Sequence, residues 1–338
     1  MTSIDVGIPC YNYGRYLREA VMSVLNQDVP NLRLLIVDNA STDDSPEIAR
    51  QIATEDDRVT LILNEENQGY VNSVNRVFDW ASSDYLVLFD ADDVMMPGAL
   101  ALGSRFLDEH PEVSFLYGVE GRMVDGLVDP GRRDPKTIRW NVVTGEAFIR
   151  RTCRDSFCDI GYTAVMRRTS AQKKAGHFRP GMLTSDFEMY LRLAMVGDVA
   201  NTNRVLGIRR MHADQLSGAH IKDRVADFID HEAAFGSFFA NEGSGFDDAE
   251  DLRQLARRKM GDYAYWYALS QRLRGRPATE VLRFAAQRRP APPWVPPLGF
   301  LFKKRWLRNL WRAGRRVTHD PVAIESVLPT PESVRVPS

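Results

Sequence analysis

Short apolar runs alternate with longer amphipathic stretches over the first 120 residues of the chain. The apolar runs have the length and composition of buried strands, and they fall at 4–9, 32–37, 59–63, 85–89 and 113–119. Between them, apolar residues recur at three- and four-residue steps, which predicts helices at 16–25, 41–52, 69–80 and 97–107. Strands separated by helices predict an α/β fold in which a mostly parallel sheet is flanked by helices.

The pattern is less regular between residues 120 and 218. A run rich in Gly, Pro, Asp and Arg at 120–143 predicts loops. Extended structure is expected at 164–167 and at 199–208, and a helix is expected between them at 187–196. We therefore place this stretch in the same domain as residues 1–120.

The last third of the chain is predicted to be mainly helical. We expect an α-helical extension at 219–288, built on two long amphipathic helices at 221–241 and 248–274. The run 289–297 is rich in proline, which predicts a stiff linker after this extension.

A basic amphipathic helix is predicted at 298–318, followed by a tail at 319–338 that we expect to be disordered. Two sets of residues separate onto opposite sides of this helix. The apolar side holds Phe302, Trp306, Leu310, Ala313 and Val317, and the basic side holds Arg305, Arg308, Arg312, Arg315 and Arg316. Such a helix, over residues 298–317, suits the surface of an anionic membrane. The alternative is that it packs on the rest of the protein with its arginines in water.

The charge of the chain is unevenly distributed. The formal net charge is −1, but residues 1–270 carry −11 and residues 271–318 carry +12. An acidic body with a basic segment predicts a contact with something anionic. Nucleic acid is not expected as the partner, because the acidic body would repel it.

Cysteine usage and hydropathy indicate the cellular compartment in which the protein works. The cysteines Cys10, Cys153 and Cys158 form no paired framework, which favours a reducing environment. No signal peptide is visible at the start of the chain, and no window approaches the roughly 20 apolar residues that span a bilayer. We therefore expect a cytoplasmic protein, with peripheral contact to the inner membrane face if the basic helix binds lipid.

Three carboxylates follow directly after the predicted strand at 85–89. Asp90, Asp92 and Asp93 have no basic residue near them in the sequence, and ionised carboxylates beside a core require a cationic partner. A hard divalent metal, shared with a substrate phosphate, is such a partner, and the end of a strand is where α/β sheets bind ligands. The alternative is that Asp92 or Asp93 caps the helix that begins near Pro97.

Two further strand ends carry residues suited to nucleotide binding. The first strand ends at Pro9, and Asn12 and Gly14 tolerate unusual backbone dihedrals, although neither G-x-G-x-x-G nor a P-loop is present. The second strand ends at Asp38, which can accept hydrogen bonds from a base or a ribose. The alternative for Asp38 is a turn in which its side chain bonds the local backbone.

These segments together resemble the family 2 glycosyltransferases, which have the GT-A fold. The resemblance covers roughly residues 3–217, and its matching segments are 6–12, 35–43, 67–75, 90–93, 163–168, 186–192 and 210–217. Two departures occur: Ser73 replaces the usual Ala, and Ser185 precedes Asp186 where the family often has Glu. The resemblance implies a GT-A domain at 1–218.

The resemblance also implies a role for each matched residue. The nucleotide would be bound by Pro9, Tyr11, Asn12, Asp38, Gly69, Asn75, Asp90 and Ala91. A divalent metal, Mg²⁺ or Mn²⁺, would be held by Asp90, Asp92 and His212. The general base that deprotonates the acceptor would be Asp186. From the residues alone, Arg209 and Arg210 beside His212 are expected to be solvated, and the alternative is that one of them makes a bidentate contact with the diphosphate.

The implied reaction is an inverting transfer of a sugar from a UDP, dTDP or GDP donor to a saccharide or lipid-linked saccharide. It would belong to bacterial-type polysaccharide or glycolipid assembly. Residues 1–120 would bind the donor and residues 121–218 the acceptor, with the loops at 120–160 shaping the sugar pocket.

Three alternatives stay open. Glu188 is a rival base, although it should point to a different side of the helix from Asp186. A sugar nucleotidyltransferase would be expected to carry a Gly-rich basic loop after the first strand, which residues 10–14 do not supply. A degenerate, non-catalytic binding module is disfavoured by the intact Asp90, Asp92 and Asp186.

Overall fold

The computed structural model describes most of the chain up to residue 289. The described residues are 2–124, 126–128, 137–156, 160, 163, 165–182, 184–212, 215, 224–289, 296–297 and 322–323. The predicted helix at 298–318 lies outside the described residues, as do most of the linker at 289–297 and most of the tail at 319–338.

Strands and helices alternate through the first 120 residues, as predicted. They are β1 (Ser3–Cys10), α1 (Gly14–Leu25), β2 (Asn31–Asp38), α2 (Ser45–Glu55), β3 (Val59–Leu63), α3 (Tyr70–Trp80), β4 (Tyr85–Leu88), β5 (Val94–Met95), α4 (Ala99–Glu109) and β6 (Val113–Val124). The later elements are β7 (Leu127–Val128), β8 (Trp140–Val143), α5 (Gly145–Asp155), β9 (Met166–Arg168), α6 (Thr169–Ala175), α7 (Ser185–Ala194), β10 (Asp198–Met211), α9 (Arg224–Ala240), the 3₁₀ helix η1 (Glu242–Gly245), α10 (Ala249–Leu273), α11 (Thr279–Arg288) and β11 (Val322–Ala323).

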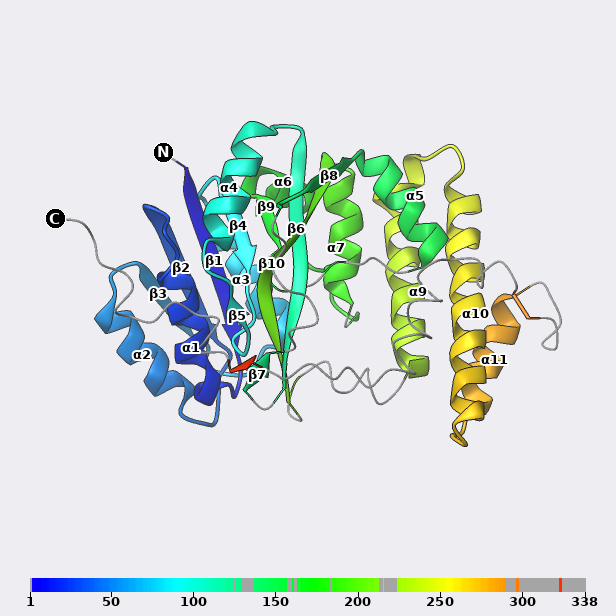
Figure 1. Cartoon of the computed structure of the whole chain (residues 1–338), viewed down its shortest axis with the longest axis horizontal. Coiled ribbons are helices and arrows are strands. Elements are labelled where there is room, and N and C mark those ends of the chain that lie inside the picture. Colours follow the sequence, from blue (N-terminus) through cyan, green and yellow to red (C-terminus); the bar gives the residue numbers. More distant parts are fainter. Residues whose placement is uncertain are drawn as a thin grey trace.

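One twisted sheet runs through the middle of the molecule (Figure 1). Its central order is β3-β2-β1-β4-β9-β6, and β10 continues it beside β6. The strands β1 to β4 are parallel, and β6 and β10 are parallel to each other, so the expectation of a mostly parallel sheet is confirmed. The short β9 runs antiparallel to both β4 and β6 and joins the two halves.

Alternate residues of each central strand enter two different cores. On β2, Leu34 and Ile36 pack with α1, α2 and α4, whereas Leu35 and Val37 pack with α3 and α7 on the other face. This period of two follows from the pleat of a strand, which points successive side chains to opposite faces. Helices therefore cover both faces of the sheet, and this fixes the carboxyl ends of the parallel strands along one edge.

The helical extension continues the layer of α7 away from the sheet (Figure 1). The ring of Phe187 on α7 lies 5.1 Å from that of Phe235 on α9, and the ring of Phe228 lies 5.8 Å from Tyr263 on α10. The two long predicted helices correspond to α9 and α10. The extension also contains α11, whose Phe284 ring stacks on the Phe228 ring with centroids 5.4 Å apart. The sequence pattern did not distinguish α11 as a separate helix.

One expectation for the middle of the chain is wrong. The stretch 120–160 was expected to form loops, but residues 145–155 form α5. Thr144 caps this helix by accepting a hydrogen bond from the Ala147 N–H at 3.2 Å, and its buried face includes Phe148 and Ile149. The many charged residues of α5 lie on its solvent side, and they masked the narrow apolar stripe in the sequence.

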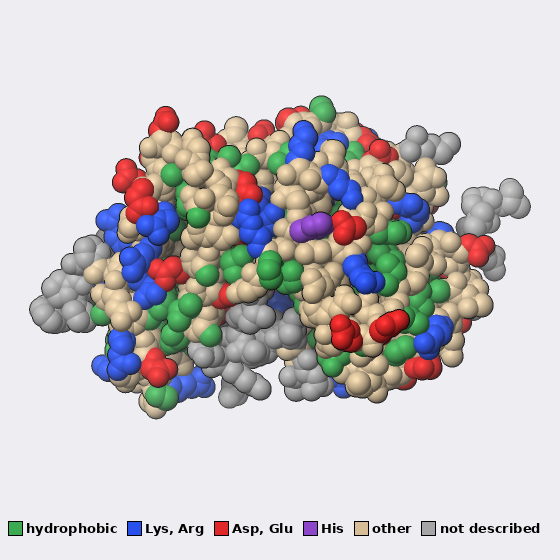
Figure 2. All heavy atoms as spheres, turned by 180° about the vertical axis from the view of Figure 1, so that it is seen from behind, with side chains coloured by type: hydrophobic (Ala, Val, Ile, Leu, Met, Phe, Trp, Pro, Cys, Tyr) green, Lys and Arg blue, Asp and Glu red, His purple; other side chains and the backbone are tan. Residues whose placement is uncertain are grey.

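The face seen in Figure 2 is mixed in charge, and the described helices are not suited to spanning a membrane. On the face shown in Figure 2, Lys and Arg side chains are interspersed with Asp and Glu. Within the described ranges, every helix is too short or too polar to cross a bilayer.

Candidate active site

A large cleft lies at the carboxyl ends of the parallel strands. Its volume is about 1440 Å³, which exceeds the roughly 300–1,000 Å³ that one small ligand usually occupies. Its walls include the residues that follow β1, β2 and β4 and the start of α7. Ligands of open α/β sheets bind at this edge, so the cleft is the candidate active site.

The loop after β1 is held against the loop after β2 by Asn12. Asn12 adopts φ +60°, its side-chain oxygen accepts a hydrogen bond from the Thr42 N–H at 2.8 Å, and its own N–H donates to the Ser41 hydroxyl at 2.9 Å. Asn favours this left-handed conformation more than most residues. Pro9, Tyr11 and Asn12 all line the cleft, where the sequence placed them.

Asp38 lies just behind the cleft wall. It is buried, and one carboxylate oxygen accepts a hydrogen bond from the Ser41 N–H at 3.0 Å, so the predicted turn interaction is present. Its other oxygen is buried without a hydrogen-bond partner among the described residues. Because a buried acceptor without a partner is costly, this oxygen is suited to a ligand donor from the adjacent cleft.

The segment after β3 contributes Gly69 but not Asn75. Gly69 lines the cleft with φ +82° and has no atom in the way of a ligand there. Asn75 donates to the Phe178 carbonyl at 3.1 Å and accepts from the Phe178 N–H at 2.8 Å, and it does not line the cleft. We therefore reassign Asn75 from nucleotide binding to joining α3 to the segment before α7.

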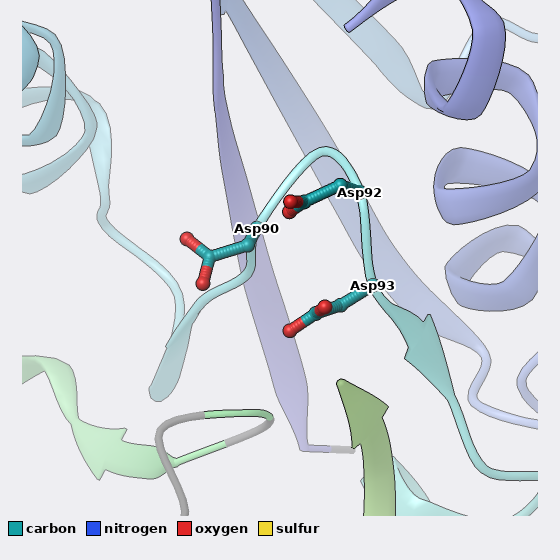
Figure 3. A group of neighbouring side chains, drawn as sticks. All are labelled: Asp90, Asp92 and Asp93. Carbon is teal, nitrogen blue, oxygen red and sulfur yellow. The ribbon is translucent and has the colours of Figure 1, made fainter. Parts of the chain in front are cut away.

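Three carboxylates converge in the turn between β4 and β5 (Figure 3). Asp90, Asp92 and Asp93 each offer an oxygen atom, and these atoms lie within 4.8 Å of one another. Ala91, between them, also lines the cleft. Asp93 was noticed in the sequence but not assigned as a ligand; it accepts from the Thr163 hydroxyl at 3.0 Å.

The carboxylates of this acidic turn repel one another, and Arg209 offsets their charge only in part. Burial and the neighbouring Asp92 raise the pKa of Asp90 to about 7, and burial raises the pKa of Asp93 as well. A bound cation would favour the ionised form of each group. Clustered carboxylate oxygens are the ligands of hard divalent metals, so the residues present fit Mg²⁺ or Mn²⁺.

The end of β10 supports the acidic turn. His212 Nε2 lies 2.9 Å from Asp92 Oδ2, and its Nδ1 is buried with no partner in the part of the chain that the structure describes. His212 is not one of the three clustered ligands, so the structure places it against Asp92. The expectation for Arg210 is wrong: it is largely buried, and it donates to the Asp92 carbonyl at 2.9 Å and through its main chain to Asp93.

Asp186 reaches the same cleft from the other half of the domain. It lies in the first turn of α7 rather than at the N-cap, which is Thr184. One of its oxygens accepts a hydrogen bond from the Phe187 N–H at 2.8 Å, and burial raises its pKa. Its charge also raises the pKa of Asp90, so the two carboxylates share one electrostatic environment.

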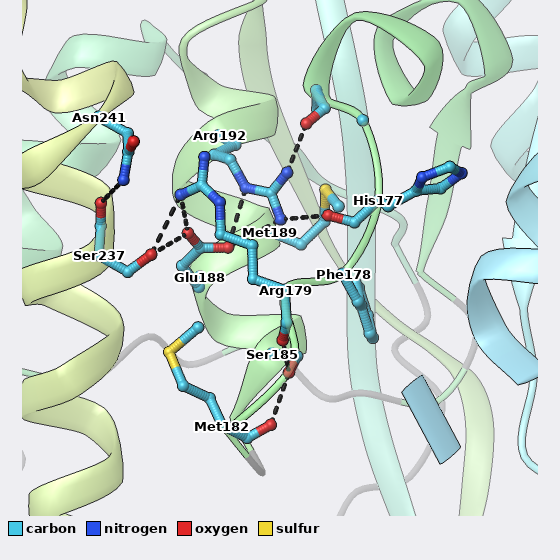
Figure 4. Close-up of polar contacts among 12 residues, drawn as sticks. His177, Phe178, Arg179, Met182, Ser185, Glu188, Met189, Arg192, Ser237 and Asn241 are labelled. Atoms are coloured by element: carbon cyan, nitrogen blue, oxygen red, sulfur yellow. Dashed lines mark hydrogen bonds and ion pairs between the residues drawn. The ribbon is translucent and has the colours of Figure 1, made fainter. Parts of the chain in front are cut away.

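Glu188 does not face the cleft but lies in a buried ion-pair cluster (Figure 4). Arg179 contacts one carboxylate oxygen, Ser237 donates to the same oxygen at 2.9 Å, and Arg192 donates to the other at 2.9 Å. Both oxygens are therefore engaged by structural partners. Of the two carboxylates on α7, only Asp186 is placed to accept a proton from a ligand.

Several cleft residues were not found from the sequence. Arg167 is almost fully buried in the wall, and its Nε has no partner among the described residues. It lies in a segment that resembles the family, so that match was an available signal. Further examples lie on α9 and α10, where no pattern in the sequence marked them: Arg224, Asp227, His231 and Tyr263.

Comparisons with known proteins agree with this geometry. The profile of the family described as Glycosyl transferase family 2 matches residues 5–173. The putative glycosyltransferase EpsE of Bacillus subtilis is 34% identical over 140 residues, covering 38% of this chain and 50% of EpsE. The chain therefore spans half the length of that relative.

Two solved structures are similar in fold. S. aureus TarS 1–349, determined with UDP-GlcNAc, is 17% identical with a TM-score of 0.61, covering 86% of this chain and 82% of that chain. The mannosyltransferase PcManGT of Pyrobaculum calidifontis, determined with GDP-Man and Mn²⁺, is 19% identical with a TM-score of 0.57, covering 92% and 82%. At these identities the likeness establishes the GT-A fold.

Proposed function

Because the chain belongs to glycosyltransferase family 2, we propose that it transfers a sugar from a nucleoside diphosphate to an acceptor hydroxyl, with inversion at the anomeric carbon. The acceptor is a saccharide or a lipid-linked saccharide of polysaccharide or glycolipid assembly. The observation that carries this proposal is the meeting of the acidic turn and Asp186 in one cleft. The volume of the cleft, about 1440 Å³, accommodates a donor and an acceptor together.

The donor nucleotide occupies the side of the cleft formed by the loops after β1 and β2. Pro9, Tyr11 and Asn12 line its slot, and the unpartnered oxygen of Asp38 accepts from a base or ribose group that reaches it. Similar folds have been solved with UDP-GlcNAc and with GDP-Man, which supports a donor of the UDP, dTDP or GDP type.

Asp90, Asp92 and Asp93 would hold Mg²⁺ or Mn²⁺ beside the diphosphate. When bound, the metal acts as a Lewis acid that stabilises the negative charge of the leaving diphosphate. His212 orients Asp92 through the bond at Oδ2, and Arg210 fixes the turn through the Asp92 carbonyl. The raised pKa values of Asp90 and Asp93 and the Mn²⁺ complex of a similar fold support this assignment.

Asp186 acts as the general base. The attacking hydroxyl loses its proton to a carboxylate oxygen of Asp186 as the new bond to the anomeric carbon forms and the bond to the diphosphate breaks. A raised pKa makes the Asp186 carboxylate a better proton acceptor. A positioned general base typically increases the reaction rate ~10²–10⁴-fold. A single base on the face opposite the leaving group is sufficient for inversion.

The competing functions make different demands on the cleft. A sugar nucleotidyltransferase is expected to carry a Gly-rich basic loop after β1, whereas that loop offers Tyr11, Asn12 and Tyr13 to the cleft. A non-catalytic binding module has no use for Asp186 with a raised pKa. Glycosyl transfer uses both the acidic turn and Asp186.

Thermal unfolding with UDP, dTDP or GDP, each with Mn²⁺ or with EDTA, tests the donor and metal sites. We expect one nucleotide to raise the Tm only when Mn²⁺ is present, since a ligand of the native state stabilises it by mass action. Asp92→Asn should abolish that shift. If no nucleotide shifts the Tm in a metal-dependent way, the donor site is not where we place it. A panel of nucleotide sugars, assayed for hydrolysis and transfer, then identifies the donor.

We place the reaction in the cytoplasm, on the inner face of the membrane if residues 298–317 bind lipid. The buried free thiols of Cys10 and Cys153 support a reducing compartment.

A further inference from the structure

The wall of the cleft next to Asp186 is built by the helical extension. Arg224, Asp227 and His231 on α9 and Tyr263 on α10 all line the cleft, and we call them the α9–α10 wall. None of them lies within residues 5–173, which match the family profile. This wall therefore lies outside the segment that the family profile matches, as Asp186 does.

Direct contacts hold α9 against the start of α7, which carries Asp186. The ring of His231 lies 5.1 Å from the ring of Phe187, the residue after Asp186. The Thr184 N–H donates to the Asp230 carboxylate at 2.6 Å. The positive charge of His231 lowers the pKa of Asp186 against the larger effect of burial, which places the two side chains in one electrostatic environment.

The polar groups of the α9–α10 wall are held in place by one another. Arg224 pairs with the Asp227 carboxylate at 2.8 Å, and His231 Nδ1 lies 2.9 Å from the Asp227 carbonyl. Asp227 and His231 are buried, and Arg224 Nε is buried without a hydrogen-bond partner among the described residues. A buried donor without a partner has unused capacity for a ligand acceptor.

This composition is suited to an uncharged saccharide. Fixed polar groups can exchange hydrogen bonds with several hydroxyls, while an aromatic side chain such as Tyr263 covers the C–H face of a sugar ring. Arg224 is paired with Asp227, and His231 and Arg167 face the charge of Asp186, so the acidic and basic groups of this wall offset one another. An anionic ligand would meet these carboxylates in a poorly solvated wall, so a neutral ligand is favoured.

We propose that the α9–α10 wall is the acceptor subsite and that it binds a neutral saccharide, with one hydroxyl directed at Asp186. This inference rests on the proposed glycosyl transfer and adds the location and charge class of the acceptor. The helical extension then determines which acceptor is used, while residues within the family segment bind the donor.

Saturation-transfer NMR of the full chain with UDP and Mn²⁺ tests the proposal. The probes are the neutral methyl glycosides of glucose, galactose and N-acetylglucosamine and the anionic methyl glucuronide. We expect at least one neutral glycoside to bind and the glucuronide to bind more weakly. His231→Ala and Arg224→Ala should each weaken glycoside binding at least about tenfold, because each removes a charged or buried hydrogen-bonding group. The UDP signals in the same tube should be unchanged.

Two further variants separate a subsite from a merely structural wall. Tyr263→Phe keeps the aromatic ring and its packing, so it should weaken glycoside binding less than His231→Ala does. Ile229 is 51% exposed on α9 and does not line the cleft, so Ile229→Ser should leave glycoside binding unchanged. The proposal is overturned if no neutral glycoside binds the wild type, or if binding survives both His231→Ala and Arg224→Ala. If the wild type binds a neutral glycoside but gives no UDP signals, the proposed donor site is contradicted and the acceptor subsite is not.

Discussion

At the scale of single residues, surroundings rather than identity separate the carboxylates of this protein. Asp186 and Glu188 are two positions apart on α7, yet Asp186 faces the cleft while Glu188 is enclosed by Arg179, Arg192 and Ser237. The sequence allowed either as the base. We propose that role for Asp186 because both oxygens of Glu188 are already engaged by structural partners.

Asp186→Asn should therefore remove turnover without removing donor binding. We expect the transfer rate to fall by ~10²–10⁴, since the amide cannot accept the acceptor proton. The metal-dependent Tm shift by the nucleotide should persist, because Asp186 is not among the clustered metal ligands. Steady-state transfer and thermal unfolding of the same sample measure both. Retained turnover would place the base elsewhere in the cleft.

The raised pKa of Asp186 predicts a pH dependence of both rate and stability. The base must be ionised, so transfer should be lost as pH falls through a value above 3.8, the ordinary value for Asp. The folded state binds this proton more tightly than the unfolded state does. The free energy of unfolding should therefore fall as pH rises from about 4 through the raised pKa.

The Asp186→Asn variant checks the stability part of this prediction. It carries no titrating group at 186, so its Tm relative to wild type should rise across that same pH interval and level off on both sides of it. A constant difference between the two proteins at all pH values would show that Asp186 does not titrate with a raised pKa.

At the scale of elements, α7 is the joint between the catalytic domain and the helical extension. Its N-terminal turn carries Asp186 into the cleft, and two residues later Glu188 binds Arg179, which also contacts Glu242 of η1. Ser237 of α9 completes this contact (Figure 4). The position of the α9–α10 wall relative to the base thus depends on a buried ion-pair cluster.

Glu188→Gln should destabilise the fold strongly. It leaves two arginines beside a neutral amide, and breaking a buried pair by removing one partner typically costs ~3–5 kcal/mol. Glu250→Gln is the matched control, since Glu250 pairs with Arg253 on the exposed surface of α10, where such pairs contribute little. Denaturant unfolding measures both variants. Equal stability of the two would mean that the cluster does not hold α7 to α9.

The predicted basic helix at 298–317 lies outside the described residues, and its membrane role stays a prediction. Its aromatic and basic sides predict binding to vesicles that contain anionic lipid, weakened by salt. Flotation with the full chain and with a variant that lacks residues 290–338 measures this. We expect only the full chain to float; equal behaviour of the two would contradict a membrane role.

At the scale of the whole molecule, the cleft forms where two halves of one sheet meet. The β1–β4 half brings the donor loops and the acidic turn, and the β6–β10 half brings the support of His212 and Arg210. The antiparallel β9 joins the halves and carries Arg167 into the wall. The extension then closes the side next to Asp186 with α9 and α10 (Figure 1).

Much of this arrangement could be predicted from local patterns. The strands β1 to β4 and β6 and the helices α1 to α4 follow from alternating apolar runs, and α9 and α10 follow from their amphipathic periodicity. The acidic turn was found because three carboxylates directly follow a buried strand. By contrast, α5 was missed because charged residues dominate its sequence, and Asn75 was misassigned because its partner, the Phe178 main chain, is distant in sequence.

The sequence by itself determined the α/β fold, the order of most of its elements and the three carboxylates that follow β4, because these depend on the spacing of residues within a few turns or one strand. Only the tertiary structure decided which carboxylate of α7 is free, where β9 enters the sheet, and which face of α9 reaches the cleft. These outcomes depend on how elements far apart in the chain pack together. Local periodicity shows which face of a helix is buried, but the neighbour against which it is buried is fixed only when the whole chain folds.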